Sequence, residues 1–365
     1  MKNKIITLIN SAIMMTLSLT VAGFSAVHAA QPTVDRTTIL VEPQTNTTFN
    51  ASTSTLTYGW LPWISFDVNG PIPNGSSISV EMSKPDGKPW VAFDCNTGSK
   101  AEGEVLKIQR CGANKFESDR MSTAAGQYGF KISIKNELEG MNQMLFSGKL
   151  KANKAFYKKD YYNKDGYEWY IDYDWALPIA EVFPDATEQS VGGIVEKEAK
   201  PLMVSFWFRG ATDNNTVAYL FYNGNQIAST ETTAEGGSWQ ERRATLLDIR
   251  TYPYSWVKNR YHFTHVLVSN SEKPDRHTDA FRMYKNPGEY EVKVLRKGKL
   301  VRTVKFTVGA DGRIVDNGVT KQNDLGTGRM TIFADVVGDE EGRQPDLTAW
   351  KTSAYFGSPL KGFGE

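Results

Sequence analysis

Asp172 and Asp174 are the two acidic residues whose spacing could support catalysis. If both lie on a strand that rises about 3.3 Å per residue, their carboxylates stand roughly 7 Å apart, the separation that an inverting glycoside hydrolase uses. Two acids on one face of a strand are more often solvated, and the sequence indicates no raised pKa. We therefore expect no catalytic residue and keep this pair as the basis of an alternative, a secreted hydrolase that acts on polysaccharide.

Three histidines remain for metal or acid–base chemistry once a leader that contains His28 is removed: His262, His265 and His277. On a strand, His262 and His265 point to opposite faces, so a zinc site would need His277 or another segment to complete it. The chain has no G-x-S-x-G motif of the kind that carries a serine nucleophile. We expect structural histidines, no metal and no cofactor.

Cys95 and Cys111 are the two cysteines of the chain, and they flank a polar loop. An even number of cysteines in an exported chain favours a disulfide, and closing a loop of this length contributes roughly 3 kcal/mol by the chain-entropy argument. The alternative, a reactive thiol pair, would have C-x-x-C spacing. The sequence therefore predicts a structural disulfide.

Two clusters of aromatic residues could bind a ligand. Residues 231–279 form an insertion that mixes aromatic and arginine side chains, namely Trp239, Arg242, Arg243, Tyr252, Tyr254 and Trp256. Residues 154–200 contain Trp169 and Trp175, and exposed rings there would suit carbohydrate because flat apolar faces stack on sugars. The alternatives are an extra strand pair in the insertion and a buried amphipathic strand over residues 168–175.

The elements that would position these residues are strands. Residues 286–308 alternate apolar and polar positions on both sides of Lys297-Gly298, which predicts a β-hairpin with one buried face. Residues 126–150 show the same pattern, and each hairpin is preceded by similar landmarks near residues 64–88 and 204–225. Because several landmarks recur in one order, we predict a tandem duplication of one all-β unit.

The G-x-Y turns that open these hairpins, at Tyr128 and Tyr290, resemble the tyrosine corner of immunoglobulin-like sandwiches. This resemblance implies that each Tyr bonds back to upstream backbone and that the chain forms two tandem immunoglobulin-like antiparallel β-sandwich domains. Phe130 and Val292 stand where antibody domains place the second cysteine of their inter-sheet disulfide. The resemblance implies no function.

The N-terminus has the pattern of a secretory signal peptide, with Lys2 and Lys4 before an apolar stretch and a small-residue cleavage site at residues 27–29. The mature chain has no apolar run of the roughly 18 residues that a membrane span requires. We therefore expect an exported chain, periplasmic, secreted or extracellular, without an integral membrane segment. The net charge of +1 argues against a nucleic acid partner.

The predicted organisation has six parts. They are a signal peptide at 1–29, a leader at 30–54 with one edge strand near 38–42, a first sandwich at 55–153, an aromatic-rich linker or first strands of the second sandwich at 154–200, a second sandwich at 201–310 with the insertion 231–279, and a C-terminal extension at 311–365 on the second sandwich. Rich β patterning with little catalytic content favours a non-catalytic protein that binds a protein or carbohydrate.

Overall fold

The computed structural model describes residues 31–97, 105–112, 118–159, 165–184, 189–191, 194–196, 200–210, 216–232, 236–244, 254–268, 280–316, 318–323, 325, 329–338, 344–358 and 360–361. The predicted signal peptide, Tyr252 and His277 lie outside these residues. Among the described helices, none is both long and apolar enough to cross a membrane.

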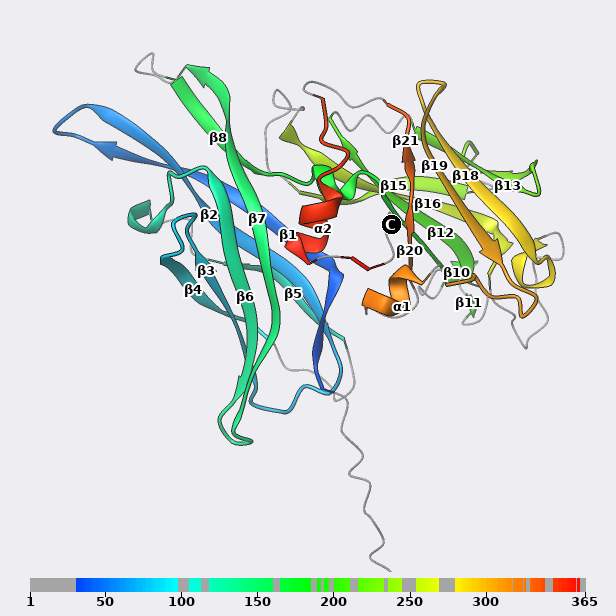
Figure 1. The fold of residues 1–365 in the computed structure, drawn as a ribbon, viewed down its shortest axis with the longest axis horizontal. Helices are drawn as coiled ribbons and strands as arrows, with labels where there is room; N and C mark the ends of the chain where they lie inside the picture. The colour runs from blue at the N-terminus through cyan, green and yellow to red at the C-terminus, as the bar shows by residue number, and fades with distance from the viewer. Residues whose placement is uncertain are drawn as a thin grey trace, which may run out of the picture.

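The first half of the chain folds into two antiparallel sheets (Figure 1). The smaller sheet has the order β1-β2-β5 and the larger has the order β4-β3-β6-β7-β8. Strand β6 illustrates how sequence alternation produces a sheet with one core face. Its apolar residues alternate, so Tyr128, Phe130 and Ile132 are buried on one face. The elements are β1 (Thr33–Asn50), β2 (Thr55–Asn69), β3 (Ser77–Ser83), β4 (Pro89–Cys95), β5 (Leu106–Gly112), η1 (Ser118–Arg120), β6 (Gly126–Asn136), β7 (Met141–Lys159) and β8 (Asp165–Ile171).

The second half has a six-stranded sheet with the path β15-β16-β12-β9-β20 and β17 paired to β16, and a five-stranded sheet ordered β14-β13-β18-β19-β21. The elements are η2 (Asp174–Ala176), β9 (Ile179–Pro184), the small hairpin β10 (Gln189–Val191) and β11 (Ile194–Glu196), β12 (Pro201–Arg209), β13 (Thr216–Tyr222), β14 (Asn225–Ser229), β15 (Gly236–Arg243), β16 (Trp256–Leu267), β17 (Phe281–Arg282), η4 (Met283–Lys285), β18 (Gly288–Arg296), β19 (Lys299–Val308), α1 (Val319–Asn323), β20 (Met330–Phe333), β21 (Asp335–Val336) and α2 (Trp350–Gly357).

The two halves share one strand order. The sheet β4-β3-β6-β7-β8 corresponds strand for strand to β14-β13-β18-β19-β21, and β1-β2-β5 corresponds to β9-β12-β16. This correspondence is what a tandem duplication predicts, and the antiparallel sheets confirm the all-β fold class. We refer to residues 31–171 as the first unit and to residues 179–336 as the second unit.

Each unit has a tyrosine at the start of the corresponding strand, β6 or β18. The Tyr128 hydroxyl donates to the carbonyl oxygen of Ala124 at 2.5 Å, and the Tyr290 hydroxyl donates to that of Asn286 at 2.7 Å. Both bonds reach four residues back along the chain, as the resemblance to the tyrosine corner implies. Both tyrosines are fully buried, so the bond also satisfies a hydroxyl that would otherwise lie in the core.

Three segments differ from their predicted roles. The predicted leader is the long strand β1, which pairs with β2 from Thr33 to Asn50. The predicted linker is divided between the units, since β8 pairs with β7 and β9 pairs with β12. The predicted insertion supplies β15 and β16; β16 pairs with β12 and corresponds to β5 of the first unit, so β15 is the additional strand. The amphipathic patterns were too short or too polar to reveal these pairings, which depend on distant partners.

The C-terminal segment packs on both units. Strand β20 extends the six-stranded sheet beside β9, whereas α2 lies against β7 and η2 (Figure 1). The helix ends in an irregular turn in which Tyr355 and Phe356 have φ of 41° and 63°, a left-handed conformation that is unfavourable for residues with a Cβ. Both rings are buried, and Phe356 packs at 5.6 Å from Phe130 and 5.7 Å from Tyr173. Burial of these rings between the units offsets the backbone strain.

The predicted disulfide is confirmed: Cys95 on β4 is bonded to Cys111 on β5, and it links the two sheets of the first unit. We expect the Cys95→Ser/Cys111→Ser variant to lower the free energy of unfolding by about 3 kcal/mol, because the unfolded chain loses a loop closure. Urea unfolding of the mature protein measures this. A reductant should lower the free energy of unfolding of the native chain by the same amount and leave that of the variant unchanged. Equal unfolding midpoints for the variant and the native chain would contradict the prediction.

Candidate functional site

The outer face of the six-stranded sheet carries a row of polar residues. The register places Trp239, Arg260, Ser205, Glu181 and Thr331 side by side across β15, β16, β12, β9 and β20. Their neighbours along the strands point to the opposite face and form the core of the second unit. An outward-facing row normally meets solvent, yet Ser205, Glu181 and Thr331 are buried.

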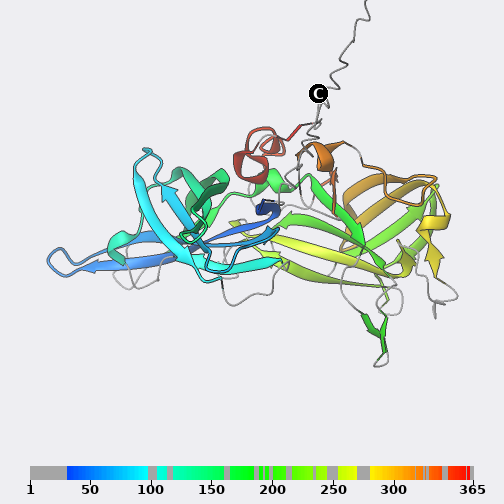
Figure 2. The ribbon, with the colours of Figure 1, turned by 90° about the horizontal axis from the view of Figure 1, so that it is seen from below.

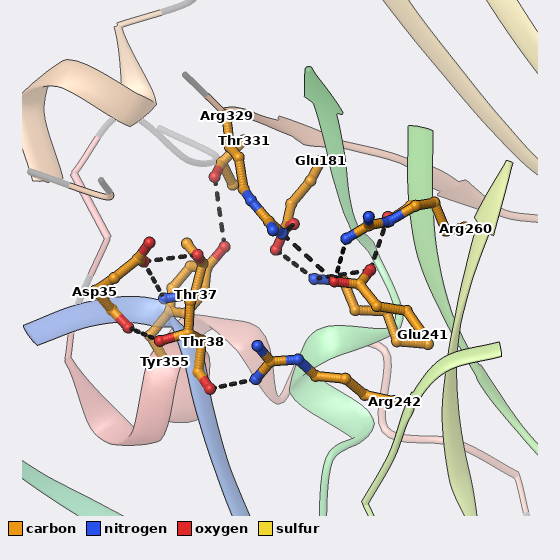
Figure 3. Close-up of polar contacts among 12 residues, drawn as sticks. Asp35, Thr37, Thr38, Glu181, Glu241, Arg242, Arg260, Arg329, Thr331 and Tyr355 are labelled. Carbon is orange, nitrogen blue, oxygen red and sulfur yellow. Dashed lines mark hydrogen bonds and ion pairs between the residues drawn. The ribbon is translucent and has the colours of Figure 1, made fainter. Parts of the chain in front are cut away.

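Charged side chains on this face form one ion-pair network (Figure 3). The Lys258 ammonium lies 2.8 Å from one oxygen of Glu181, and the Arg329 guanidinium lies 2.7 Å from the other. Arg260 contacts Glu241 at 2.6 Å, and the Ser205 hydroxyl donates to the same carboxylate at 3.1 Å. Since Lys258 and Glu181 are almost completely buried, their mutual contacts replace their hydration.

The network keeps its carboxylates ionised. Burial alone would raise the pKa of Glu181, but the charges of Lys258 and Arg329 outweigh burial and lower that pKa below its ordinary value. The pKa of Glu241 is likewise lowered, because Lys258, Arg260 and Arg329 outweigh its burial. A general acid needs a raised pKa, so these two glutamates are placed as structural ion-pair partners.

Segments from elsewhere in the chain close the network. Asp35 and Thr37 of β1 lie beside it, with the Thr37 hydroxyl donating to Asp35 at 2.7 Å (Figure 3). Burial raises the pKa of Asp35, although hydrogen bonds from Thr37 oppose the rise. The Tyr355 and Thr331 hydroxyls are 3.4 Å apart, and Arg242 of β15 donates to the Thr38 carbonyl. The first unit and the tail thus seal a charged face of the second unit.

Asp174, in the segment that connects the two units, forms a second buried polar cluster. Its carboxylate accepts from Arg209 at 3.4 Å, from the Trp256 indole at 3.1 Å and from the Asp346 backbone amide at 3.0 Å. Its side chain and that of Arg209 are 1% and 0% exposed, so neither charge is available to solvent. This carboxylate joins η2, β12, β16 and the tail.

The predicted acid pair is therefore corrected. Strand β8 ends at Ile171, and Asp174 opens a 3-10 helix, so the two acids are not aligned on a strand. Asp172 lies 3.9 Å from Lys151 and accepts from the Asp174 amide. Both acids line a cavity of about 230 Å³ together with Asp346, whose pKa is lowered by hydrogen bonds from Thr348. The separation of roughly 7 Å, which assumed that both acids lie on one strand, therefore does not apply to this pair.

Most of the aromatic residues predicted to bind a ligand are packed inside the protein. Trp169 stacks on Trp60, and Trp175 packs on Tyr355 and Phe356. Trp256 is completely buried, and Tyr254 is half-buried against Tyr170. Trp169, Trp175 and Trp256 are thus architectural, which corrects their interpretation as a ligand platform. The alternative of a buried strand over residues 168–175 holds for burial, but the strand itself ends at Ile171.

Trp239 differs from the other predicted aromatic residues because it is 40% exposed. It lies on the edge strand β15, with the Arg260 guanidinium 5.9 Å from its ring centre and the His262 ring at 6.0 Å. Arg243 is also predicted to bind a ligand, and its side chain lies outside the part of the chain that the structure describes. We call Trp239, Arg260 and His262 the Trp239 surface.

His262 and His265 lie on β16, as the strand pattern predicts. Within the described ranges, no group of three histidine, cysteine, aspartate or glutamate side chains is placed to hold a metal ion. His277 lies outside those ranges, so a zinc site completed by His277 stays a hypothesis.

Sequence reasoning missed a groove on the first unit. It has a volume of about 690 Å³ and lies between β3, β4, β6, β7 and α2, with Trp90, Lys131 and Lys149 in its lining. Two glycines on adjacent strands, Gly129 and Gly148, also line it. Glycine weakens a strand interior and often marks close approach, so this pair is the signal that could have indicated the groove.

The ion-pair network makes a testable prediction about stability. Lys258→Met should destabilise the protein by about 3–5 kcal/mol, because it removes a positively charged partner of the buried carboxylates of Glu181 and Glu241. The double variant Glu181→Leu/Lys258→Met should lose less than the sum of the two single variants, since Arg329 keeps Glu241 as partner at 3.7 Å. Urea unfolding measures all four chains. Lys305→Met, whose side chain is 71% exposed, is the control and should change little; additive single effects would contradict the network.

The same network predicts sensitivity to acid. The pKa values of Glu181 and Glu241 are lowered in the folded state, so the unfolded chain binds more protons below about pH 4.5, the ordinary value for Glu. Their contribution to stability is therefore complete at neutral pH and lost as the pH falls further. Between pH 5 and 3, Glu241→Gln should show a shallower loss of unfolding free energy than the native chain, and identical slopes would refute this assignment.

Comparisons with known proteins give no family. No known family model matches the chain, and no curated protein matches it. A solved structure described as "Enterococcal surface protein, partial N-terminal region" is similar at 8% identity over 72% of this chain and 92% of that one, with a TM-score of 0.17. A score this low supports no argument about fold or function, so both rest on the chain itself.

Proposed function

We propose that the chain is an exported, non-catalytic protein of two tandem β-sandwich units that binds a protein or glycan ligand. The observation that carries this proposal is the use of the acids: Glu181, Glu241 and Asp174 are each buried in ion pairs that join parts of the fold. Chemistry at these groups would require breaking contacts that hold the structure together. The Cys95–Cys111 disulfide supports an oxidising, extracytoplasmic location.

Of the predicted binding residues, Trp239 is the best supported. An exposed indole with a guanidinium beside it combines two side chains that dominate binding energy at interfaces. Arg260 is oriented by its contact with Glu241, so the surface is preorganised by the network behind it. A ligand that covers Trp239 would meet a rigid edge strand.

The hydrolase alternative keeps one supporting observation, the cavity that Asp172 and Asp174 line. It makes a distinct prediction: the protein would release reducing ends from a polysaccharide, and Asp172→Asn would abolish this release. Asp172 is preferable to Asp174 for this test because Asp174 is completely buried and its loss would destabilise the fold.

We test the binding proposal with the mature chain on an array of immobilised glycans and peptides. Trp239→Ala should weaken retention of the bound probe by roughly 30-fold, the effect of losing a hot-spot residue of about 2 kcal/mol. Phe333→Ala is a matched control, since Phe333 is 42% exposed on β20 at the other edge of the same sheet. Unchanged retention by Trp239→Ala would reject this surface, and reducing ends that depend on Asp172 would replace the proposal by the hydrolase.

A further inference from the structure

A long hairpin projects from the first unit. Strands β1 and β2 pair out to Asn50 and Thr55, whereas β5 pairs with β2 only between Trp63 and Val68. Beyond this point the two strands continue as a ribbon that leaves the body of the sandwich (Figures 1 and 2). A second hairpin, β7–β8, extends from the opposing sheet. The tips of the two hairpins diverge (Figure 1).

The face of the ribbon that continues the core is apolar at its end. The register pairs Thr45 with Trp60 and Phe49 with Leu56, and residues at these alternate positions share one side of the ribbon. Trp60 is completely buried in the core, but Phe49 is 47% exposed. The ribbon therefore carries the inward-facing row out of the core into solvent.

The opposing hairpin supplies matching rings. Tyr58 of the ribbon lies edge-on to Tyr167 of β8, with centroids 6.3 Å apart. Tyr167 lies edge-on to Phe156 of β7 at 6.4 Å, and Phe156 is 53% exposed. We call these residues, with Phe49, the distal aromatic surface. A hydrogen bond from the Trp169 amide to the Thr45 hydroxyl, 2.9 Å long, ties the two hairpins together at its base.

The ribbon that carries Phe49 and Tyr58 is uncharged, whereas the opposing hairpin carries several charged residues. None of the 24 residues from Pro43 to Phe66 is charged, although charged residues make up 23% of the chain. Their polar groups are hydroxyls and amides from Thr, Ser, Asn and Gln. On the opposing hairpin, Lys154 lies over the Tyr167 ring at 4.7 Å, and Lys159 and Asp165 neutralise each other in an ion pair.

We propose that the distal aromatic surface binds a neutral polysaccharide. Aromatic rings offer apolar area for the C–H faces of sugars, and the flanking hydroxyls and amides can exchange hydrogen bonds with sugar hydroxyls. A charged ligand would find no complementary charge on the ribbon. Protein interfaces favour Arg beside aromatic residues, which the Trp239 surface has and this one lacks.

This inference rests on the proposed function in that the chain is a binding protein, but it assigns a different surface and one ligand class. Phe49 and Phe156 lie on strands of the first unit, whereas Trp239 lies on β15 of the second unit. The two assignments can therefore fail separately.

The test is affinity electrophoresis of the native mature chain in gels that contain dextran, mannan, laminarin or hydroxyethyl cellulose, with polygalacturonate as the acidic contrast. At least one neutral polymer should retard the chain. Phe49→Ala and Phe156→Ala should each weaken that retardation constant by roughly tenfold, and the double variant by more. Both side chains are half-exposed, so folding should be preserved, which the unfolding midpoint checks.

Two variants serve as controls in the same gels. Leu138→Ala removes an 89% exposed apolar side chain in the turn between β6 and β7, and it should bind as the native chain does. Phe333→Ala, which removes a 42% exposed ring on β20 of the second unit, should also keep full retardation by the neutral polymer. Absence of retardation by every neutral polymer, or equal retardation of native and Phe49→Ala/Phe156→Ala chains, would overturn the assignment. A dimer in sedimentation velocity that this double variant dissociates would also overturn it, in favour of a second copy of the chain.

Discussion

The buried carboxylate of Asp174 fixes the segment that connects the two units against the second unit and the tail. A charge with almost no exposure is stable only if its partners are fixed, and here they come from β12, β16 and the tail. Arg209 in turn cannot leave Asp174 without becoming an unpaired buried charge. The position of η2 between the units is therefore set by electrostatics as well as by the rings that surround it.

The outer face of the six-stranded sheet extends the same logic. Its residues alternate with the core of the second unit as in any sandwich, but the first unit and α2 cover part of it. The result is a face that is polar in sequence and buried in structure, closed by Glu181, Lys258 and Arg329. Where the cover ends, Trp239 emerges at the edge of the same row. Structural charges and an exposed ring thus lie on one continuous surface.

Sequence patterns predicted those parts of the fold that depend on local alternation. The hairpin of β18 and β19, the matching strand β6 and the disulfide all follow from residues that are close in sequence or of one type. The patterns failed where the decisive partner is remote: β1 looks like a polar leader because its tip is rich in Thr and Asn, and Asp174 looks like a solvated acid. Burial of an outward-facing charge depends on what covers it, and alternation carries no information about a cover.

The central claim is that the buried carboxylate of Asp174 holds in place the segment that connects the two units, so it is tested most directly by residue-resolved hydrogen exchange of Asp174→Asn. Ile132 lies in the core of the first unit and Val292 in that of the second, and both amides belong to central strands. The account predicts that both amides lose protection, by similar factors, relative to the native chain. Unchanged protection at both, or loss confined to one unit, would contradict it.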